Sequence, residues 1–330
     1  MKNKKALIKT FTGLAISLGL VGWLVFSIDW QEVLKQLKTV DYFYFIPVTI
    51  IIFSQFIFRT IRWQYLVPHK ESMTFRLSFD SNIIGNFVNY ILPLRAGEIF
   101  RPYFLSRRSE NNFSSCFAAV VIERFFDLSA VLILFAFTLM GASNLEPWMN
   151  QGAKALTFLA LLIFIYIISV IVFPKFIENL TNRILDFLPE KVASFFKHFL
   201  DGLFAGAKVI KNKKNIFIIL TCTSMVWFVT ALQYYTLLFI FDLTPTFYSG
   251  ILITVVIALA VAAPSAPGFI GVFQIACIAA FYLLGFDKET ATTYALLSHL
   301  HMYLIVIIYG GYVMLHYGLK LKDLQVEKKT

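Results

Sequence analysis

Long apolar runs alternate with short polar segments along most of this chain. The runs are roughly 17–28 residues long, which is the length that a helix needs to cross about 30 Å of hydrocarbon. The pattern therefore predicts an all-α protein, a polytopic membrane helix bundle with about six full spans. The predicted spans are Thr10–Ile28, Tyr42–Phe58, Phe113–Met140, Ala155–Phe173, Asn215–Phe241 and Thr290–Tyr317.

Two further apolar segments, Leu77–Leu94 and Thr246–Phe286, are interrupted by proline and glycine. Backbone polar groups in lipid must be satisfied internally, so such a break is tolerated where protein or water covers it. Each segment is predicted to form a re-entrant hairpin or, in the alternative, to raise the total to as many as eight spans. The residues assigned to the broken-helix elements are Asn89, Pro93, Gly97, Pro264, Pro267, Gly268 and Gly271.

The two breaks occupy corresponding places in the chain, because each follows one predicted span and precedes another. Residues 41–140 and 215–317 would then be inverted repeats within a single membrane domain, 1–330. Paired breaks in two halves of a membrane protein point to a transport site. The alternative is a pair of ordinary loops whose shared Pro/Gly spacing is coincidental.

Composition and charge support a membrane location and orient the chain. Hydrophobic residues make up 58% and charged residues only 15%, where a soluble domain carries about 25% charged residues. The net charge of +10 comes without a nucleic-acid recognition motif, so no nucleic-acid partner is expected. If both termini are cytoplasmic, 24 of the 29 Lys and Arg fall on the cytoplasmic side, as the positive-inside rule requires.

The largest predicted cytoplasmic insertion, residues 175–214, has apolar residues at helical spacing. We interpret it as amphipathic helices on the cytoplasmic leaflet, with lysines near anionic headgroups. The alternative is a helix pair packed on the bundle.

Three charges lie inside the predicted span Phe113–Met140, namely Glu123, Arg124 and Asp127. Each charge near a bilayer centre costs about 2.5–3.5 kcal/mol on insertion scales, so the group must face protein or a water-filled cavity. The partners expected for it lie beside the first break, at Arg95, Glu98 and Arg101. A cavity with excess arginine suits a lipid phosphate, because the guanidinium fork donates two parallel hydrogen bonds. The alternative is a structural ion-pair network, and the two roles are compatible.

Four other polar residues are predicted as accessory positions. Arg59 and Arg62 follow the second span and are interpreted as anchors that reach the interface. His299 is expected to be neutral and hydrogen-bonded, and a proton-coupling role is left open for it; Gln274 follows the second break. We expect no metal, no cofactor and no catalytic nucleophile, because no motif for them is present.

These residues resemble the lysylphosphatidylglycerol synthase transmembrane-region family, also called the flippase-like or UPF0104 family. The resemblance covers about residues 5–320 and rests on four motifs. They are Arg59-x-x-Arg62-Trp63, Asn89-x-x-x-Pro93-x-Arg95-Ala96-Gly97-Glu98-x-x-Arg101, Glu123-Arg124-x-x-Asp127 and Pro264-x-x-Pro267-Gly268-x-x-Gly271. The resemblance implies a lipid-handling membrane domain. Gln274 departs from the family, which often has Glu after the second break, and puts a mechanism that needs this carboxylate in doubt.

The leading hypothesis is a translocase for a lipid or lipid-linked intermediate in a prokaryotic inner membrane, with membrane lipids, anionic or phosphate-bearing, as partners. The headgroup would bind Arg95, Glu98, Arg101, Glu123, Arg124 and Asp127. One alternative is a non-catalytic scaffold for a membrane enzyme, and another is an integral-membrane transferase acting on a lipid phosphate. Aminoacyl-lipid synthase activity is not expected, because too few residues follow the last span for the soluble transferase domain.

Overall fold

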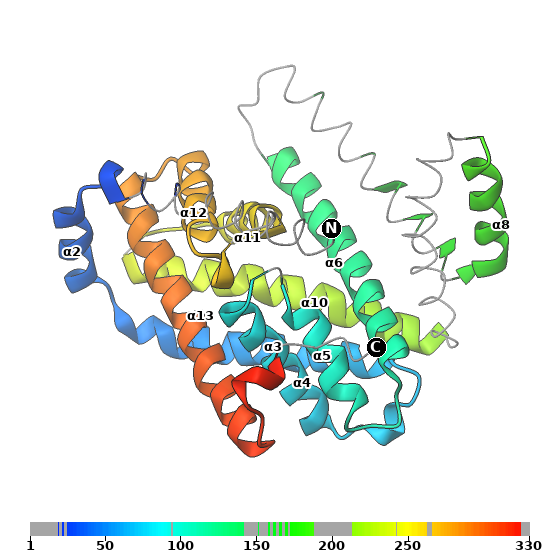
Figure 1. The fold of residues 1–330 in the computed structure, drawn as a ribbon. Coiled ribbons are helices and arrows are strands. Elements are labelled where there is room, and N and C mark those ends of the chain that lie inside the picture. Colours follow the sequence, from blue (N-terminus) through cyan, green and yellow to red (C-terminus); the bar gives the residue numbers. More distant parts are fainter. Residues whose placement is uncertain are drawn as a thin grey trace. The chain divides into compact units, whose positions relative to one another are not determined.

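Every regular element that the computed structural model describes is a helix (Figure 1). These are residues 25–93, 95–141, 169–170, 172–187, 213–241, 243–262 and 266–324, with the isolated positions 19, 22, 151, 158, 161–162 and 165–166. The chain divides into two compact units built from interleaved stretches. Unit 1 comprises Met1–Ile57, Asp80–Arg101 and Trp227–Thr330, and unit 2 comprises Phe58–Phe79 and Pro102–Val226.

Three described helices are long and apolar enough to cross a membrane, at Tyr42–Leu66, Lys214–Phe241 and Lys288–His316. They correspond to η1 (Tyr42–Tyr44) with α3 (Phe45–Leu66), to α10 (Lys213–Leu238) with η3 (Phe239–Phe241), and to α13 (Lys288–His316). The predicted spans in these places are confirmed. However, α3 continues to Leu66 instead of ending at Phe58, so Arg59 and Arg62 lie inside the helix.

The predicted span Phe113–Met140 is also a helix, α6 (Phe113–Gly141), which is as long as α13 at 29 residues. It carries three charged residues within one turn, Glu123, Arg124 and Asp127. Most of Thr10–Ile28 and of Ala155–Phe173 lies outside the described residues.

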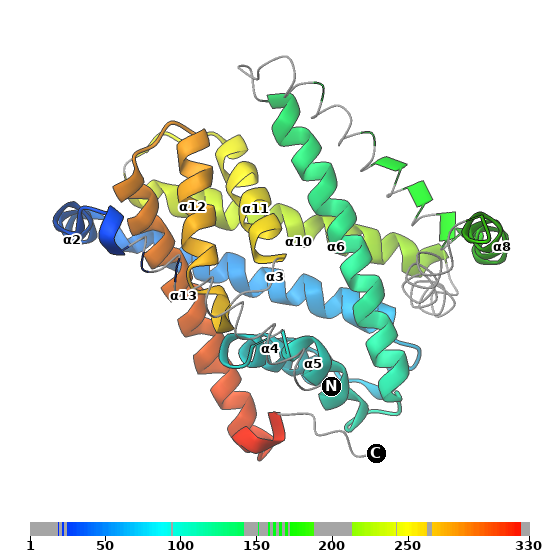
Figure 2. The ribbon, with the colours of Figure 1, turned by 45° about the horizontal axis from the view of Figure 1, so that its top comes forward.

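In unit 1 the amphipathic helix α2 (Trp30–Thr39) packs against α13 (Figure 2). Asp29 begins α2 by accepting hydrogen bonds from the backbone N–H groups of Gln31 and Glu32. Gln36 then bonds to two threonines of α13: its Nε2 donates to Thr290 Oγ1 at 3.1 Å, and Thr293 Oγ1 donates to its Oε1 at 2.9 Å. These bonds fix the short helix to the end of the long one.

Each predicted break is flanked by two short helices. The first lies between α4 (Phe75–Ile91) and α5 (Gly97–Ser106). The second separates α11 (Phe247–Ala262) from η4 (Pro267–Phe269) and α12 (Val272–Leu283).

The two helices of the second break pack side by side (Figure 2). They have 16 and 12 residues. At 1.5 Å per residue they span about 24 and about 18 Å, each less than the roughly 30 Å of hydrocarbon. The lengths favour a hairpin, and the choice between re-entrance and two crossings stays a prediction.

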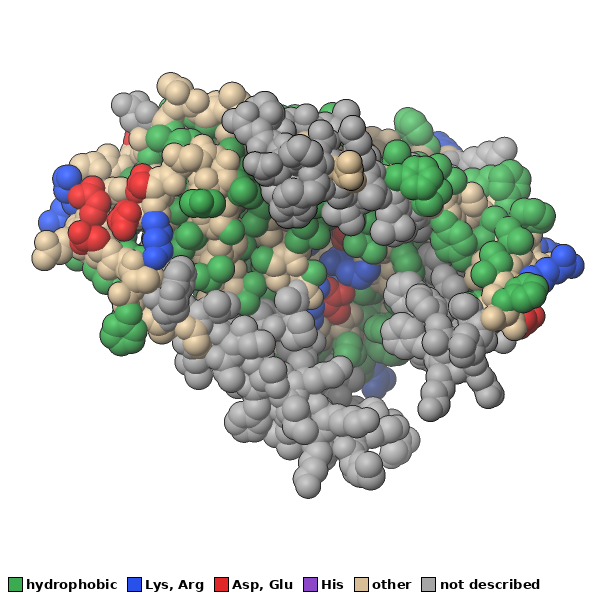
Figure 3. Space-filling model, turned by 90° about the horizontal axis from the view of Figure 1, so that it is seen from above, with side chains coloured by type: hydrophobic (Ala, Val, Ile, Leu, Met, Phe, Trp, Pro, Cys, Tyr) green, Lys and Arg blue, Asp and Glu red, His purple; other side chains and the backbone are tan. Residues whose placement is uncertain are grey.

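Unit 2 has its own apolar core, which includes Trp63, Leu66, Ile122, Phe126 and Ile219. Hydrophobic side chains are the most widespread of the described ones on the face of the chain drawn in Figure 3, and the charged ones lie in small separate groups. The unit also contains η2 (Lys70–Ser72) and α8 (Pro174–Leu185), and η5 (Leu321–Leu324) follows α13 in unit 1.

Helix α8 opens the insertion predicted at residues 175–214. Its Phe176, Leu180 and Ile184 are exposed at helical spacing, while Leu185 is buried. The rest of the insertion that carries the predicted amphipathic pattern lies outside the described residues, so its place on the leaflet stays a prediction.

Candidate functional site

Arg62 of α3 lies completely buried in unit 2, against two carboxylates of α6. Its Nη1 donates to Asp127 Oδ1 at 2.7 Å and its Nη2 to Asp127 Oδ2 at 3.3 Å, so the guanidinium fork binds this carboxylate bidentately. Nη2 also donates to Glu123 Oε1 at 2.9 Å. Nη1 donates in addition to Thr223 Oγ1 of α10 at 3.1 Å, and the Thr223 hydroxyl donates onward to the Ile219 carbonyl. One arginine thus holds three helices together.

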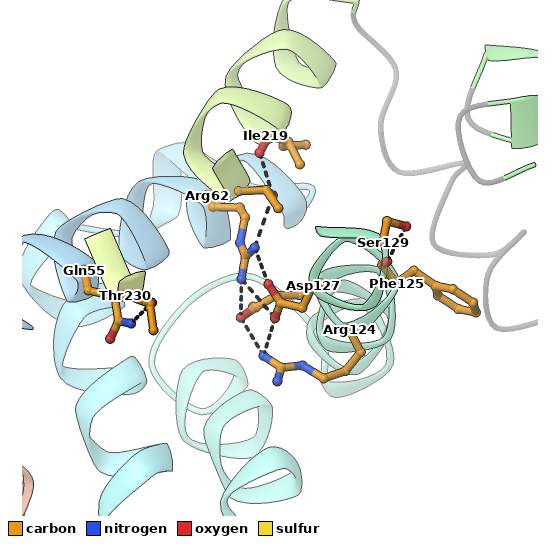
Figure 4. A network of polar contacts seen from close by, with 10 residues as sticks. Gln55, Arg62, Arg124, Phe125, Asp127, Ser129, Ile219 and Thr230 are labelled. Atoms are coloured by element: carbon orange, nitrogen blue, oxygen red, sulfur yellow. Dashed lines mark hydrogen bonds and ion pairs between the residues drawn. The ribbon is translucent and has the colours of Figure 1, made fainter. Parts of the chain in front are cut away.

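Arg124 binds the same two carboxylates from the other side (Figure 4). Its Nη2 lies 2.9 Å from Glu123 Oε1 and 3.0 Å from Asp127 Oδ2. Glu123 and the Arg62 side chain are 0% exposed, whereas the Arg124 side chain is 39% exposed. The cluster is therefore buried at Arg62 and open at Arg124.

Helical spacing explains why these residues meet. Glu123 and Asp127 are four residues apart on α6, one turn along the same face, and Arg124 reaches Asp127 at i,i+3. Both expectations from the sequence are confirmed by the ion pairs. The burial expected from the cost of these charges is confirmed as well, most completely for Glu123.

The interpretation of Arg62 as an interfacial anchor is wrong. An anchor keeps its charged head in water, but the Arg62 guanidinium is sealed inside unit 2 by Glu123, Asp127 and Thr223. The sequence contained a signal for this contact. Two carboxylates one turn apart in a membrane helix carry two negative charges, and Arg124 alone supplies one positive charge. Arg62 supplies the second.

Arg59 lies one turn before Arg62 and is the third arginine of this cluster. It is half-buried and within electrostatic reach of Asp127, Glu123, Arg124 and Arg62. Its Nε is buried without a hydrogen bond, and no ion pair of Arg59 occurs among the described residues. Among the described residues of this cluster, three arginines therefore face two carboxylates, a difference of one positive charge.

The first break belongs to unit 1 and is closed by a side-chain cap. Asn89 Oδ1 accepts a hydrogen bond of 2.8 Å from the backbone N–H of Gly97, where α5 begins. Gly97 packs directly on Gly85 of α4, since a Cβ built on Gly97 would lie 1.8 Å from the Gly85 carbonyl oxygen. Asn89 and Gly97, both predicted as broken-helix elements, thus hold the two helices together.

Arg95 joins the first break to the second. It adopts a left-handed backbone conformation, with φ 54°. Its guanidinium donates to the carbonyl of Val261 in the last turn of α11 and lies 5.7 Å from the centroid of the Phe269 ring. Arg95 also lies 3.9 Å from Glu98. This geometry gives Arg95 a positioning role at the end of α11, because the last carbonyls of a helix lack partners within it.

Left-handed backbone shapes the second break. Gly268 and Gly271 have φ values of 67° and 86°, and Phe269, between them, has 61°. Glycine adopts these values without steric cost, which is why the break contains it. Pro267 begins the 3₁₀ turn η4, and Pro264 lies outside the described residues.

The headgroup residues predicted from the sequence are divided between the units. Glu123, Arg124 and Asp127 form one cluster in unit 2, with Arg62 and Arg59. Arg95, Glu98 and Arg101 belong to unit 1. The pairing predicted between the two sets stays a prediction.

Comparison with known proteins identifies relatives along most of the chain. The family model described as the lysylphosphatidylglycerol synthase TM region matches residues 10–310. A UPF0104 membrane protein of Methanocaldococcus jannaschii is 25% identical over 232 residues, covering 68% of this chain and 92% of the relative. A UPF0104 membrane protein of Pyrococcus horikoshii is 21% identical over 276 residues, covering 77% of this chain and 81% of the relative. No solved structure matches.

Proposed function

The chain belongs to the lysylphosphatidylglycerol synthase transmembrane-region family of multi-pass membrane proteins, and from this premise we propose that it moves a phosphate-bearing lipid across a membrane. The membrane would be the prokaryotic cytoplasmic membrane, with both termini on the cytoplasmic side. The headgroup would bind at the unit 2 cluster of Arg59, Arg62, Glu123, Arg124 and Asp127 while the acyl chains stay in lipid. The proposal involves no covalent step.

The observation that carries the proposal is that Arg59 lies near Asp127 and Glu123 but forms no ion pair among the described residues. A charge inside a membrane helix costs about 2.5–3.5 kcal/mol even where it can adjust its position, and Arg59 has no ion pair among the described residues to offset this cost. An anionic group bound at Arg59 would supply the missing partner. Among the described residues the cluster has one more positive than negative charge, and the phosphodiester of a lipid headgroup carries one negative charge.

The arginines would have different roles in this proposal. Arg62 has its terminal nitrogens engaged by Asp127, Glu123 and Thr223, so it positions the carboxylates and does not bind lipid. Arg59 and the partly exposed Arg124 are the two that can reach a headgroup. Arginine suits this task because its fork matches phosphate oxygens bidentately.

The broken helices of unit 1 suit a transporter in a second way. Non-helical backbone at membrane depth is tolerated where it is buried in protein or lines a cavity, and transporters place binding sites at such breaks. The first and second breaks approach each other within unit 1 through Arg95, Val261 and Phe269.

Replacing Arg59 by glutamine is expected to lower the rate of lipid movement by about tenfold or more, because a hydrogen bond to a charged group is worth about 1.5–3 kcal/mol. The purified protein is reconstituted in vesicles of phosphatidylglycerol and phosphatidylethanolamine, and movement of a fluorescent phosphatidylglycerol analogue is followed by quenching from outside. Arg59→Lys should retain part of the rate, since it keeps the charge but not the fork.

The matched control is Arg76→Gln, which makes the same change of charge at an exposed position of unit 2. Arg76→Gln should leave the rate within about twofold of wild type, the scatter expected for an exposed residue. If Arg59→Gln moves lipid as fast as wild type, the cluster does not bind the headgroup. If the wild-type protein moves no lipid across a panel of anionic and zwitterionic headgroups, the scaffold alternative is favoured.

A further inference from the structure

A buried histidine and a buried glutamine meet at the second break of unit 1. Gln274 lies in the first turn of α12, and its Oε1 accepts a hydrogen bond of 2.8 Å from the backbone N–H of Gly271. Its Nε2 lies 2.9 Å from Nδ1 of His299 in α13. Gln274 and His299 are each 7% exposed. One side-chain amide therefore connects the start of α12 to the histidine ring.

These contacts determine which ring nitrogen of His299 carries the proton. A backbone N–H can only donate, so the amide oxygen of Gln274 must face Gly271 and the amide nitrogen must face the ring. An amide nitrogen can only donate, so Nδ1 accepts and the neutral ring carries its proton on Nε2. Among the described residues Nε2 makes no hydrogen bond of normal geometry, although the backbone of Gly268 is close enough to interact with the ring.

We propose that His299 and Gln274 form a proton-binding site that controls the N-terminus of α12 at the second break. A proton taken up from water would add to the lone pair of Nδ1 and convert the ring to imidazolium, in which both nitrogens donate. The Gln274 amide nitrogen would then face another donor. Turning the amide by half a rotation would present its oxygen to Nδ1, and would turn its nitrogen toward the Gly271 N–H.

Gln274 can satisfy only one of its two partners once the ring is charged. A hydrogen bond to an ionised group is about twice as strong as one between neutral groups. The amide oxygen therefore turns to the imidazolium, and the Gly271 N–H loses its acceptor. Protonation of His299 in α13 therefore breaks the hydrogen bond from the Gly271 N–H to Gln274 that caps the start of α12.

The released cap lies where the backbone is least regular. Gly271 is the residue before α12 and has φ 86°, and Gly268 and Phe269 are also left-handed. Glycine can adopt many backbone conformations, so the conformation of Gly271 depends on its contacts, and the hydrogen bond to the Gln274 amide is one of them. Proton uptake by His299 would make the backbone before α12 more mobile. The inference rests on the proposed function and adds to it that proton binding controls backbone movement at the second break.

The other groups around the ring are aromatic. Phe273 of α12 stacks on it at 4.6 Å between ring centroids. Tyr90 of α4 and Tyr303 of α13 lie 6.2 and 6.1 Å away and are the titratable neighbours. The described charge at this break is Arg95, over the Phe269 ring.

The second histidine of α13 is not part of this site. His301 bonds through Nε2 to Thr49 Oγ1 of α3 at 2.8 Å. The variant His299→Phe distinguishes the nitrogen-15 signals of the His299 ring from those of the His301 ring.

The test is hydrogen exchange of the full-length protein in nanodiscs between about pH 8 and about pH 5, the window in which histidine titrates. After correction for the intrinsic pH dependence, protection of the Gly271 amide should fall by about fivefold at low pH, the value of one hydrogen bond. Residues 247–262 of α11 serve as the internal control and should keep their protection. In Gln274→Glu, a carboxylate accepts from Gly271 and from imidazolium together, so the fall should disappear.

A second variant, His299→Phe, keeps a ring against Phe273 and cannot take up a proton, so its Gly271 protection should not change with pH. Nitrogen-15 spectra of labelled histidine, assigned with this variant, should show both nitrogens of His299 protonated at low pH. A ring that stays neutral at about pH 5 overturns the proposal, as does an equal loss of protection in wild type and Gln274→Glu. Neither hydrogen exchange nor the nitrogen-15 spectra depend on lipid movement. The proton site can therefore be confirmed or overturned whether or not the protein moves lipid.

Discussion

The free energy of unfolding is expected to fall by about 3–5 kcal/mol when Arg62 is replaced by methionine, because the change leaves buried charge without its partner. Methionine retains much of the side-chain length and packs against the apolar residues of unit 2. The decrease in the free energy of unfolding therefore measures the loss of the charge and of its hydrogen bonds. Asp127 loses its bidentate partner and Thr223 loses a donor. Equilibrium unfolding in mixed micelles measures the change.

Arg59→Met is the matched control, because it removes the same side chain from the same helix one turn earlier. Arg59 has no ion pair among the described residues, so its removal should cost no more than about 0.5 kcal/mol. The double variant Arg59→Met with Arg62→Met should lose more than the two single variants together if Arg59 partly replaces Arg62. Equal losses in the two single variants would contradict the division of roles between these arginines.

The apolar runs predicted most of the long helices and misjudged one helix end. The spans at Asn215–Phe241 and Thr290–Tyr317 agree with the structure within a few residues. The second span was predicted to end at Phe58, directly before Arg59, yet α3 continues to Leu66. Hydropathy assigns each charge its cost in isolation, whereas Arg62 offsets that cost with an ion pair to α6.

The candidate site could be predicted only as far as contacts are local. Glu123, Arg124 and Asp127 lie within one turn, so their shared face follows from helical geometry. The contact of Arg62 with Asp127 joins residues 65 positions apart, and no spacing rule contains it. The hydrogen bond between Gln274 and His299 also joins residues far apart in the sequence, 25 positions, so no spacing rule predicts it. The Pro/Gly composition did place the break beside these residues.

Gly97→Ala is expected to destabilise the protein by at least about 3 kcal/mol, the upper range for overpacking in a well-packed interior. Helix propensity alone predicts the opposite sign, since alanine is better than glycine in a helix by about 1 kcal/mol. The contact decides the outcome: the added Cβ would lie 1.8 Å from the Gly85 carbonyl oxygen and 2.7 Å from Asn89 Oδ1. Both atoms belong to α4, so α4 and α5 must separate. Unfolding of the purified protein in mixed micelles measures the loss.

Two glycines of α13 separate this steric effect from the general cost of the substitution. Gly311 has no heavy atom within 4 Å of a built Cβ, so Gly311→Ala should stabilise the protein by up to about 1 kcal/mol. At Gly310 the added Cβ would lie 2.5 Å from Cδ2 and 2.6 Å from Cβ of Phe87. The ring can rotate but the Phe87 Cβ cannot, so Gly310→Ala should be destabilising, though less than Gly97→Ala, whose obstacle is a backbone oxygen at 1.8 Å. If Gly97→Ala is as stable as Gly311→Ala, then α4 and α5 do not pack closely at the first break. In that case Asn89 does not cap α5 either, because its 2.8 Å bond to the Gly97 N–H requires the same approach of the two helices.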